Sequence, residues 1–292
     1  MTAPIAATAF AAAKVNLYLH VAPPTPDGYH PIASLMAFAD VGDELSAEPA
    51  DTLSLSIVGP FSAGLPVSDD NLVLRAVRAL LAHARRPDAG AKLILTKALP
   101  IAAGLGGGSS DAGAALRLIN DMLELGFSEA RLEAVAAEIG ADGAACLRGQ
   151  MLTAQGRGEV LSAAPAMPPL PAVLVNPGVP SPTGAVYRAY DKSGAPGGDD
   201  LPLAPDLGSV AKAAAWLAQC RNDLEPSALA LEPRIAEALA ALAAEPESIL
   251  TRMSGSGATC FCLCATRHDA EVLAARLTAA RPGWWVRAST LS

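Results

Sequence analysis

The sequence is poor in aromatic residues and in charge, and it has no basic surplus. Aromatic residues make up 4% of the 292 residues and charged ones 17%, whereas hydrophobic residues make up 51%. A chain this apolar can fill sizeable cores, which excludes a disordered protein. Lysine and arginine (21) are outnumbered by aspartate and glutamate (29), so the formal net charge is -8. Without a basic run, nucleic acid is excluded as the main partner, although a single nucleotide needs only a local site.

Long apolar runs are also missing. No stretch reaches the roughly 18 residues that a membrane-spanning helix requires. The apolar start, residues 1–13, lacks the basic segment that precedes the core of a signal peptide. We therefore expect this start to belong to the mature protein, a cytoplasmic location and no membrane association.

Cysteine is scarce, and its number is odd. Five cysteines in a chain of this length do not form the pattern of a disulfide framework. Cys260, Cys262 and Cys264 alternate, which places three small side chains on one face of an apolar strand. Paired C-x2-C ligands, which are typical of zinc sites, are absent. We interpret these thiols as core residues rather than metal ligands.

Alternating apolar residues dominate the first hundred positions, and helical spacing is frequent after them. The patterns predict strands at 13–21, 51–58, 92–97, 260–264 and 284–289. They predict helices at 71–84, 109–125, 128–140 (with Ser128 as N-cap), 210–219, 233–244 and 269–280. Four prolines between 162 and 171 indicate a domain boundary, and 191–206 is rich in loop residues. The mixture predicts an α+β protein with two domains, 1–164 and 165–292.

The most informative segment is glycine-rich and spans residues 100–110. Glycines at 104 and 106–108 let backbone N–H groups point into one space without interference from Cβ atoms. The helix predicted directly after them adds a partial positive charge and further free N–H groups. Ser109 and Ser110 place hydroxyls at the junction, where they can bind phosphate oxygens or Mg²⁺. The segment is therefore typical of a phosphate-binding loop.

Two familiar phosphate-binding motifs do not fit this segment. A P-loop has a lysine after its glycines, where this chain has serine. The dinucleotide fingerprint of Rossmann folds has a third glycine, where Ser109 stands, which disfavours an NAD-binding protein. A flexible surface loop in front of a helix, without any ligand, remains the plain alternative.

The order of the motifs resembles the GHMP kinase superfamily, which includes galactokinase and the homoserine, mevalonate and phosphomevalonate kinases. Pro-x3-Gly-Leu-Gly-Gly-Gly-Ser-Ser-Asp-Ala at 100–112 is similar to its ATP loop, and Met-Ser-Gly-Ser-Gly-Ala at 253–258 to its C-terminal glycine motif. The resemblance implies an N-terminal domain like domain 2 of ribosomal protein S5 and a C-terminal ferredoxin-like α/β sandwich. It also implies an active site in the cleft between the domains, with ATP as phosphoryl donor and Mg²⁺ as cofactor.

The N-terminal tracts resemble one family within this superfamily. Ala-Lys-Val-Asn-Leu-Tyr-Leu at 13–19, followed by Pro-Asp-Gly-Tyr-His at 26–30, is similar to the kinases that phosphorylate the 2-hydroxyl of CDP-linked methylerythritol in the non-mevalonate isoprenoid pathway. Three further motifs fit the same family, at 140–142, 176–178 and 221–225. Three features depart from the family pattern: Ala102-Ala103, Asp111 and Gly143-Ala144-Ala145.

The resemblance assigns Lys14 and Asp142 as the catalytic pair. Asp142 would accept the proton of the substrate hydroxyl as it attacks the γ-phosphorus. Lys14 would favour the ionised hydroxyl and shield the negative charge of the transferring phosphoryl group. Judged by residue type alone, Lys14 is an exposed strand residue and Asp142 a turn residue.

The resemblance also assigns the residues that bind the two substrates. Asn16 shares a strand face with Lys14, and Tyr29 and Tyr187 would stack on the cytosine base. His30 would read the hydrogen-bonding edge of the base through its peptide or imidazole groups. Thr183 completes the acceptor site, and Ser110 is a candidate Mg²⁺ ligand. The ATP-binding residues would be Pro100, Ile101, Ala102, Ala103, Gly104, Leu105, Gly106, Gly107, Gly108, Ser109 and Ser110.

Two other functions stay open at this point. One is another GHMP small-molecule kinase of the homoserine or mevalonate type. The other is a non-catalytic module that binds ATP without turnover. We expect a small-molecule CDP-linked partner for the favoured function, and a monomer or homodimer.

Overall fold

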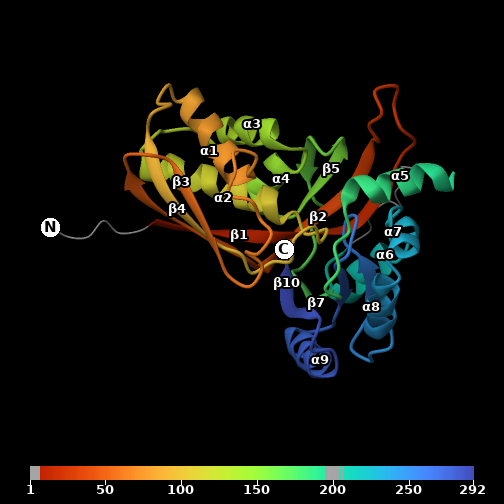
Figure 1. Cartoon of the computed structure of the whole chain (residues 1–292). Helices are drawn as coiled ribbons and strands as arrows, with labels where there is room; N and C mark the ends of the chain where they lie inside the picture. Colours follow the sequence, from red (N-terminus) through yellow and green to blue (C-terminus); the bar gives the residue numbers. More distant parts are fainter. Residues whose placement is uncertain (1–6, 195–196, 198–203, 205–206) are drawn as a thin grey trace. The chain divides into compact units, whose positions relative to one another are not determined.

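The structure is a computed structural model of the whole chain, and it describes residues 7–194, 197, 204 and 207–292 (Figure 1). Two compact units can be distinguished. Unit 1 comprises residues 1–13, 42–99 and 106–149, and unit 2 comprises residues 14–41, 100–105 and 150–292. Neither unit is one continuous segment, because β1 (Ala7–Val21) and β2 (Ile32–Ala50) contribute residues to both. The domain boundary between 164 and 165 stays a prediction.

Unit 1 is a β-sheet covered by helices. Its strands are the first half of β1, the second half of β2, β3 (Ser54–Val58) and β4 (Gly90–Thr96). Strand β1 pairs with β2, and β4 is antiparallel to β2 and parallel to β3. The helices α1 (Leu72–His83), α2 (Gly107–Met122), α3 (Glu129–Ile139) and α4 (Gly143–Arg148) lie together beside this sheet (Figure 1). One apolar core joins the helices to the strands, and it includes Leu80, Leu93 and Leu116.

Local sequence explains these elements. Along β4, Ala91, Leu93 and Leu95 are buried on one face, which is the alternation that a half-buried strand requires. Helix α1 begins after Asn71, whose Oδ1 accepts a hydrogen bond from Val73 N at 3.0 Å.

Unit 2 contains an antiparallel sheet with the strand order β10-β7-β9-β8. The strands are β7 (Leu170–Asn176), β8 (Leu250–Met253), β9 (Cys260–Leu263) and β10 (Trp285–Leu291). Helices α8 (Arg234–Ala243) and α9 (Arg267–Ala280) pack on this sheet in a single core, in which Cys260, Cys262 and Cys264 are buried. A strand, helices, two strands, a helix and a strand follow one another, as in ferredoxin-like folds.

Unit 2 holds further elements outside this sheet. The first half of β2 pairs with β5 (Leu152–Gly156), which pairs with β6 (Val160–Ala163), both antiparallel. Helices α5 (Thr183–Ser193), α6 (Val210–Leu217) and α7 (Glu225–Leu231) complete the unit. None of the helices in the described ranges is long and apolar enough to cross a membrane.

The predicted helices correspond to α1, α2, α3, α6, α8 and α9, and the predicted strands to β1, β3, β4, β9 and β10. Ser128 stands at the N-cap of α3 as predicted, but its side chain makes no capping hydrogen bond. Among the elements missed, β2, α4 and α5 matter most for the site. Helix α5 occupies the beginning of the loop predicted at 191–206, and most of the remaining loop lies outside the described residues, as do residues 1–6.

Helices α3 and α4 approach each other closely at Gly143, next to Asp142. A Cβ atom at Gly143 would lie 2.0 Å from the backbone oxygen of Ala136, well inside van der Waals contact. Glycine is therefore required here for space, because only the missing side chain lets the start of α4 reach α3.

Replacing Gly143 with alanine should lower the free energy of unfolding by about 1–3 kcal/mol, because the backbone must move to admit the methyl group. The thermal midpoint should fall by roughly 2–10 °C. Gly140→Ala is the matched control, since nothing lies within 4 Å of a Cβ at Gly140. Calorimetry of both variants measures the difference, and equal midpoints would contradict this packing.

Candidate active site

The glycine-rich loop ends in unit 1 at the start of α2. Gly106 is the N-cap and has a left-handed backbone with φ of 62°. Ser110 lies in the first turn, and its backbone N–H donates to Gly106 O at 2.9 Å. Ser110 Oγ is buried and has no hydrogen-bond partner among the described residues. Free N–H groups at a helix start, beside an unpartnered hydroxyl, fit an anionic ligand.

A buried ionic cluster lies behind this helix start. Lys97 Nζ donates to Asp43 Oδ2 at 2.5 Å and to Asp111 Oδ2 at 2.7 Å. Asp43 Oδ1 accepts from the backbone N–H groups of Ala98 and Leu99, at 2.6 and 2.8 Å. The cluster therefore fixes both the end of β4 and, through Asp111, the N-terminal part of α2.

Burial and charge act in opposite directions in this cluster. Burial alone would lower the pKa of Lys97, but the carboxylates of Asp111 and Asp43 outweigh it and raise that pKa. Burial raises the pKa of Asp111 to about 7, against the opposing effect of Lys97. A Cβ at Gly107 would lie 3.0 Å from Lys97 Nζ, so the ammonium group also lies against the glycine loop.

In unit 2, residues 100–105 pack against residues 254–258. A Cβ at Gly104, where φ is +73°, would lie 2.3 Å from Ser254 O. Ser254 Oγ donates to Gly104 O at 2.9 Å, and Thr259 N donates to Ala103 O at 3.0 Å. The two glycine-rich motifs that the sequence singled out are thus brought into contact within this unit.

Lys14 and Asn16 lie on β1 beside these two motifs. Lys14 Nζ donates to Asn16 Oδ1 at 3.0 Å, and Lys14 N donates to Leu105 O at 2.8 Å. Asn16 N donates to Ser254 Oγ at 3.1 Å, and Asn16 Nδ2 donates to Ser34 Oγ at 2.8 Å. Lys14 is only 5% exposed, so the expectation from residue type, an exposed strand lysine, is wrong.

Asp142 belongs to unit 1, whereas Lys14 belongs to unit 2. It is half-buried at the N-cap position of α4, and its backbone oxygen accepts from Cys146 N at 2.9 Å. Its carboxylate makes no capping hydrogen bond to that helix. A helix follows Asp142 directly, where the sequence predicted only a turn. The catalytic pairing of Asp142 with Lys14 stays a prediction.

His30 and Tyr187 lie together in unit 2, as the prediction of a shared site requires. Their ring centroids are 5.2 Å apart. The two ring nitrogens of His30 face acceptors within the protein, with Nδ1 2.8 Å from Ala22 O and Nε2 3.0 Å from Asp191 Oδ1. The imidazole is thus held in place, and Tyr187 is positioned on α5 beside it.

Tyr29 is 56% exposed, and the guanidinium group of Arg157 lies on its ring, 4.0 Å from the centroid. Arg157 also forms an ion pair with Asp27. Arg157 could not be predicted from the sequence, because this contact joins the β5–β6 turn to a loop more than a hundred residues earlier.

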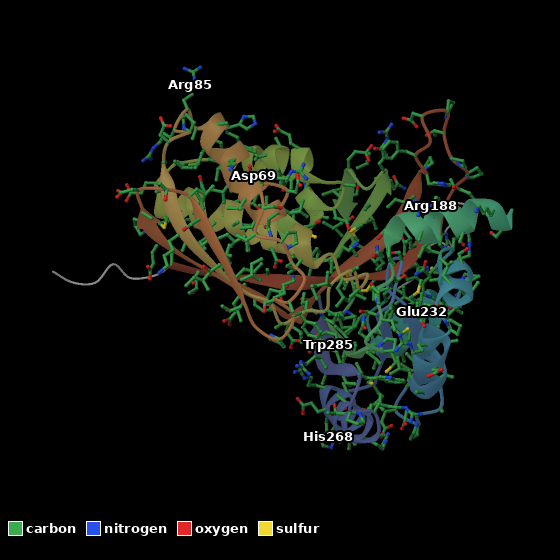
Figure 2. The ribbon with its side chains drawn as sticks, viewed as in Figure 1. Asp69, Arg85, Arg188, Glu232, His268 and Trp285 are labelled. Atoms are coloured by element: carbon green, nitrogen blue, oxygen red, sulfur yellow. The ribbon has the colours of Figure 1, made fainter. Side chains whose placement is uncertain are left out.

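Thr183 is the first residue of α5, and its Oγ1 lies 2.9 Å from Ser256 Oγ. Arg188, on the same helix, is labelled in Figure 2. Its Nη1 would lie 3.3 Å from a Cβ at Gly184, so the guanidinium group covers the first turn of α5. Arg188 was not predicted as a site residue, because no motif in the sequence marks it.

The fold and the two glycine motifs define a class of phosphoryl-transfer enzymes. The family model "GHMP kinases N terminal domain" matches residues 71–150, and "GHMP kinases C terminal" matches residues 201–282. The chain is therefore a GHMP kinase, and an ATP-using reaction follows from that class.

Relatives with higher sequence identity identify one family within the GHMP kinases. A protein of Caulobacter vibrioides named 4-diphosphocytidyl-2-C-methyl-D-erythritol kinase is 59% identical over 98% of this chain and 99% of its own length. A crystal structure of 4-(cytidine 5'-diphospho)-2C-methyl-D-erythritol kinase has a TM-score of 0.79, with 34% identity over 98% of this chain and 99% of that one. The chain belongs to this kinase family.

A homoserine kinase from Cytophaga hutchinsonii also has the fold, with a TM-score of 0.72, but it is only 19% identical over 99% of this chain and 96% of its own. That likeness shows the fold alone. The expectations of an α+β GHMP kinase fold and of an ATP-dependent small-molecule kinase are confirmed by these matches. The roles of the individual site residues stay predictions.

Replacing Asp111 with asparagine should remove a pH dependence of stability. The folded protein holds the Asp111 proton up to about pH 7, whereas the unfolded chain releases it near pH 4. This carboxyl therefore favours folding at low pH, and that contribution is lost as the pH rises through 7. Because asparagine mimics the protonated form, Asp111→Asn should gain up to a few kcal/mol over the wild type between about pH 5 and pH 8.

Urea denaturation of both proteins at the two pH values, in metal-free buffer, measures this gain. Asp121→Asn on the exposed end of α2 is the matched control and should show a constant difference from the wild type. A constant difference for Asp111→Asn as well would refute the raised pKa.

Proposed function

We propose that the protein phosphorylates the 2-hydroxyl of 4-diphosphocytidyl-2-C-methyl-D-erythritol with ATP, giving the 2-phosphate and ADP. The near-full-length match to relatives of that name carries the proposal. The buried Lys14–Asn16 pair, packed beside both glycine motifs, supports it with the charge and donors that phosphoryl transfer needs. A place in the non-mevalonate isoprenoid pathway, a cytoplasmic location and a monomeric or homodimeric state remain predictions from the sequence.

The transfer forms a bond between the substrate oxygen and the γ-phosphorus and breaks the bond from that phosphorus to the bridging oxygen of ADP. Asp142 accepts the proton of the attacking hydroxyl. Lys14 stabilises the negative charge of the hydroxyl oxygen and of the transferring group. Asn16 orients Lys14, since its Oδ1 accepts the hydrogen bond from Lys14 Nζ.

The start of α2 binds the ATP phosphates in this proposal. Backbone N–H groups of 106–108 and the hydroxyls of Ser109 and Ser110 are the donors. The buried, unpartnered Ser110 Oγ fits a ligand of Mg²⁺, which takes few protein ligands and keeps several waters. Mg²⁺ held here would supply positive charge that offsets the charge of the ATP phosphates. The role of Lys97 is to hold this end of the helix in place through Asp111, and Asp43 in turn holds Lys97.

The cytidine end of the acceptor is assigned to His30, Tyr187 and Tyr29. Because both ring nitrogens of His30 face acceptors in the protein, its main chain is the better candidate to read the cytosine edge. Tyr187 supplies a stacking face. The guanidinium group of Arg188 and the hydroxyl of Thr183, both at the start of α5, are suited to the diphosphate.

The substrate assignment is tested by measuring ADP release with three acceptors. Turnover is expected with the CDP-linked methylerythritol and not with homoserine or mevalonate. ADP release with either of the other alcohols alone would assign a different GHMP kinase activity. Binding of ATP with no turnover on any acceptor would indicate the non-catalytic module.

Replacing Asp142 with asparagine should leave the fold intact and lower kcat by about 10²-fold or more, the usual effect of losing a general base. Asp88→Asn, on an exposed loop of the same unit, is the control and should keep normal turnover. Steady-state kinetics and circular dichroism of both variants provide the measurement. A near-normal kcat in Asp142→Asn would end the assignment of Asp142 as base.

A further inference from the structure

The motif Arg-Asn-Asp-Leu-Glu at 221–225 has no role in the mechanism above. In unit 2 it runs beside β1, the strand that carries Lys14 and Asn16. Leu19 N donates to Arg221 O, and Asp223 N donates to Leu19 O, both at 2.9 Å. The motif therefore lies where it can couple this strand to another part of the unit.

Asn222 makes that connection. Its side chain is buried, and Nδ2 donates to Met253 O and to Gly255 O, each at 2.8 Å. Its Oδ1 accepts from Leu224 N at 3.0 Å. Both N–H groups and the oxygen of the carboxamide are thus engaged in hydrogen bonds, and the two N–H groups donate to residues of the glycine-rich segment 253–255.

The loop that Asn222 holds carries two donors of its own. Gly255 and Gly257 have left-handed backbones, with φ of 56° and 82°, so the loop has few side-chain restraints. Among the described residues, no backbone carbonyl accepts from the N–H groups of Gly255 and Ser256. Buried N–H groups are normally paired, so two adjacent ones without a backbone acceptor point to an anionic ligand.

Other contacts restrain the loop from different sides. Ser254 Oγ donates to Gly104 O at 2.9 Å, and Ser181 Oγ donates to Ser256 O at 2.6 Å. Asn222 binds both of the carbonyls that flank Ser254, and these carbonyls set the direction of the peptide units that follow them. Fixing a carbonyl oxygen fixes the N–H group of the same planar peptide, here those of Ser254 and Ser256.

We propose that Asn222 is a positioning residue for phosphoryl transfer. Its carboxamide holds Met253 O and Gly255 O, and it thereby keeps the N–H group of Ser256, which shares a peptide unit with Gly255 O, directed at a phosphate of the bound ligands. The inference rests on the proposed kinase function. Because the donors and the acceptor of the Asn222 side chain are all used within the protein, Asn222 acts through the loop that it holds.

The sharpest variant is Asn222→Asp, which keeps the shape of the side chain. It replaces the donor NH2 group with a carboxylate oxygen that faces two carbonyl oxygens, so both hydrogen bonds are lost and repulsion replaces them. We expect kcat to fall about 10²-fold, the effect of misplacing groups at a reacting centre by about 1 Å. Asn222→Ser, which keeps one donor with a shorter reach, should give a smaller loss and serves if the aspartate variant does not fold.

Asn120→Asp is the matched control. Asn120 is also buried and holds a backbone segment, since its Oδ1 accepts from Phe127 N at 2.9 Å in unit 1. If the amide is purely structural, replacing it should lower the stability of the protein. In the folded variant, kcat and KM should then stay within about twofold of the wild-type values, as expected for a site independent of catalysis. Thermal denaturation of all variants identifies a temperature at which each of them is folded, and the kinetics are compared at that temperature.

Amide hydrogen exchange gives a second readout that needs no substrate. In Asn222→Asp, peptides covering 253–258 should exchange faster, while those of β7 should keep the wild-type rate. A kcat within threefold of wild type in the folded Asn222 variants overturns the proposal. Unchanged exchange at 253–258, or an equal kinetic loss in Asn120→Asp, overturns it too. Failure of the wild type to phosphorylate the CDP-linked acceptor refutes the proposed function instead, and the exchange result stands apart from it.

Discussion

The site in unit 2 depends on a backbone approach that only glycine permits. At Gly104 the chain passes so close to residues 254–257 that a Cβ atom would lie 2.3 Å from Ser254 O. This approach lets Ser254 Oγ accept from Asn16 N while donating to Gly104 O. One hydroxyl thereby links three segments that are far apart in the sequence. Any side chain at Gly104 would separate them and displace the strand that carries Lys14.

The position of the charged Lys97 side chain near the glycine loop is also tightly constrained. Lys97 lies against Gly107, but its ammonium group is shared between two buried carboxylates, so it does not act as an open phosphate-binding charge. Burying these ions costs free energy that is offset only by close pairing and by hydrogen bonds to the backbone. Asp43 provides those bonds through Ala98 and Leu99. The cluster fixes the loop rather than binding the ligand.

Much of this arrangement was predictable from sequence, because short-range patterns encode it. The glycines of both motifs and the common face of Lys14 and Asn16 could be recognised directly. Lys97 could also have been recognised, because it continues the buried positions 91, 93 and 95 of β4, where a lysine needs a partner. The identity of its partner was not readable, since Asp43 lies 54 residues earlier on β2.

The elements that were missed lack such patterns. Residues 33–39 of β2 are buried on both faces, so no alternation marks them. Helix α4 has only six residues, of which the first four are small, and its start is set by its contact with α3 at Gly143. The stacking of Arg157 on Tyr29 joins distant turns. These features follow from tertiary contacts, and a single sequence carries no local trace of them.

The hydrogen-bond donors of the two glycine motifs are electrically neutral. Both glycine motifs offer backbone N–H groups and hydroxyls, and the cation that lies against Gly107, Lys97, is already paired with carboxylates. Neutral donors bind phosphate through direction more than through charge, so their affinity depends on how rigidly they are held. The proposed site therefore combines the cation of Lys14 with directional neutral donors. It is correspondingly sensitive to the residues that fix its backbone, which is why a buried amide such as Asn222 can matter without touching the substrate.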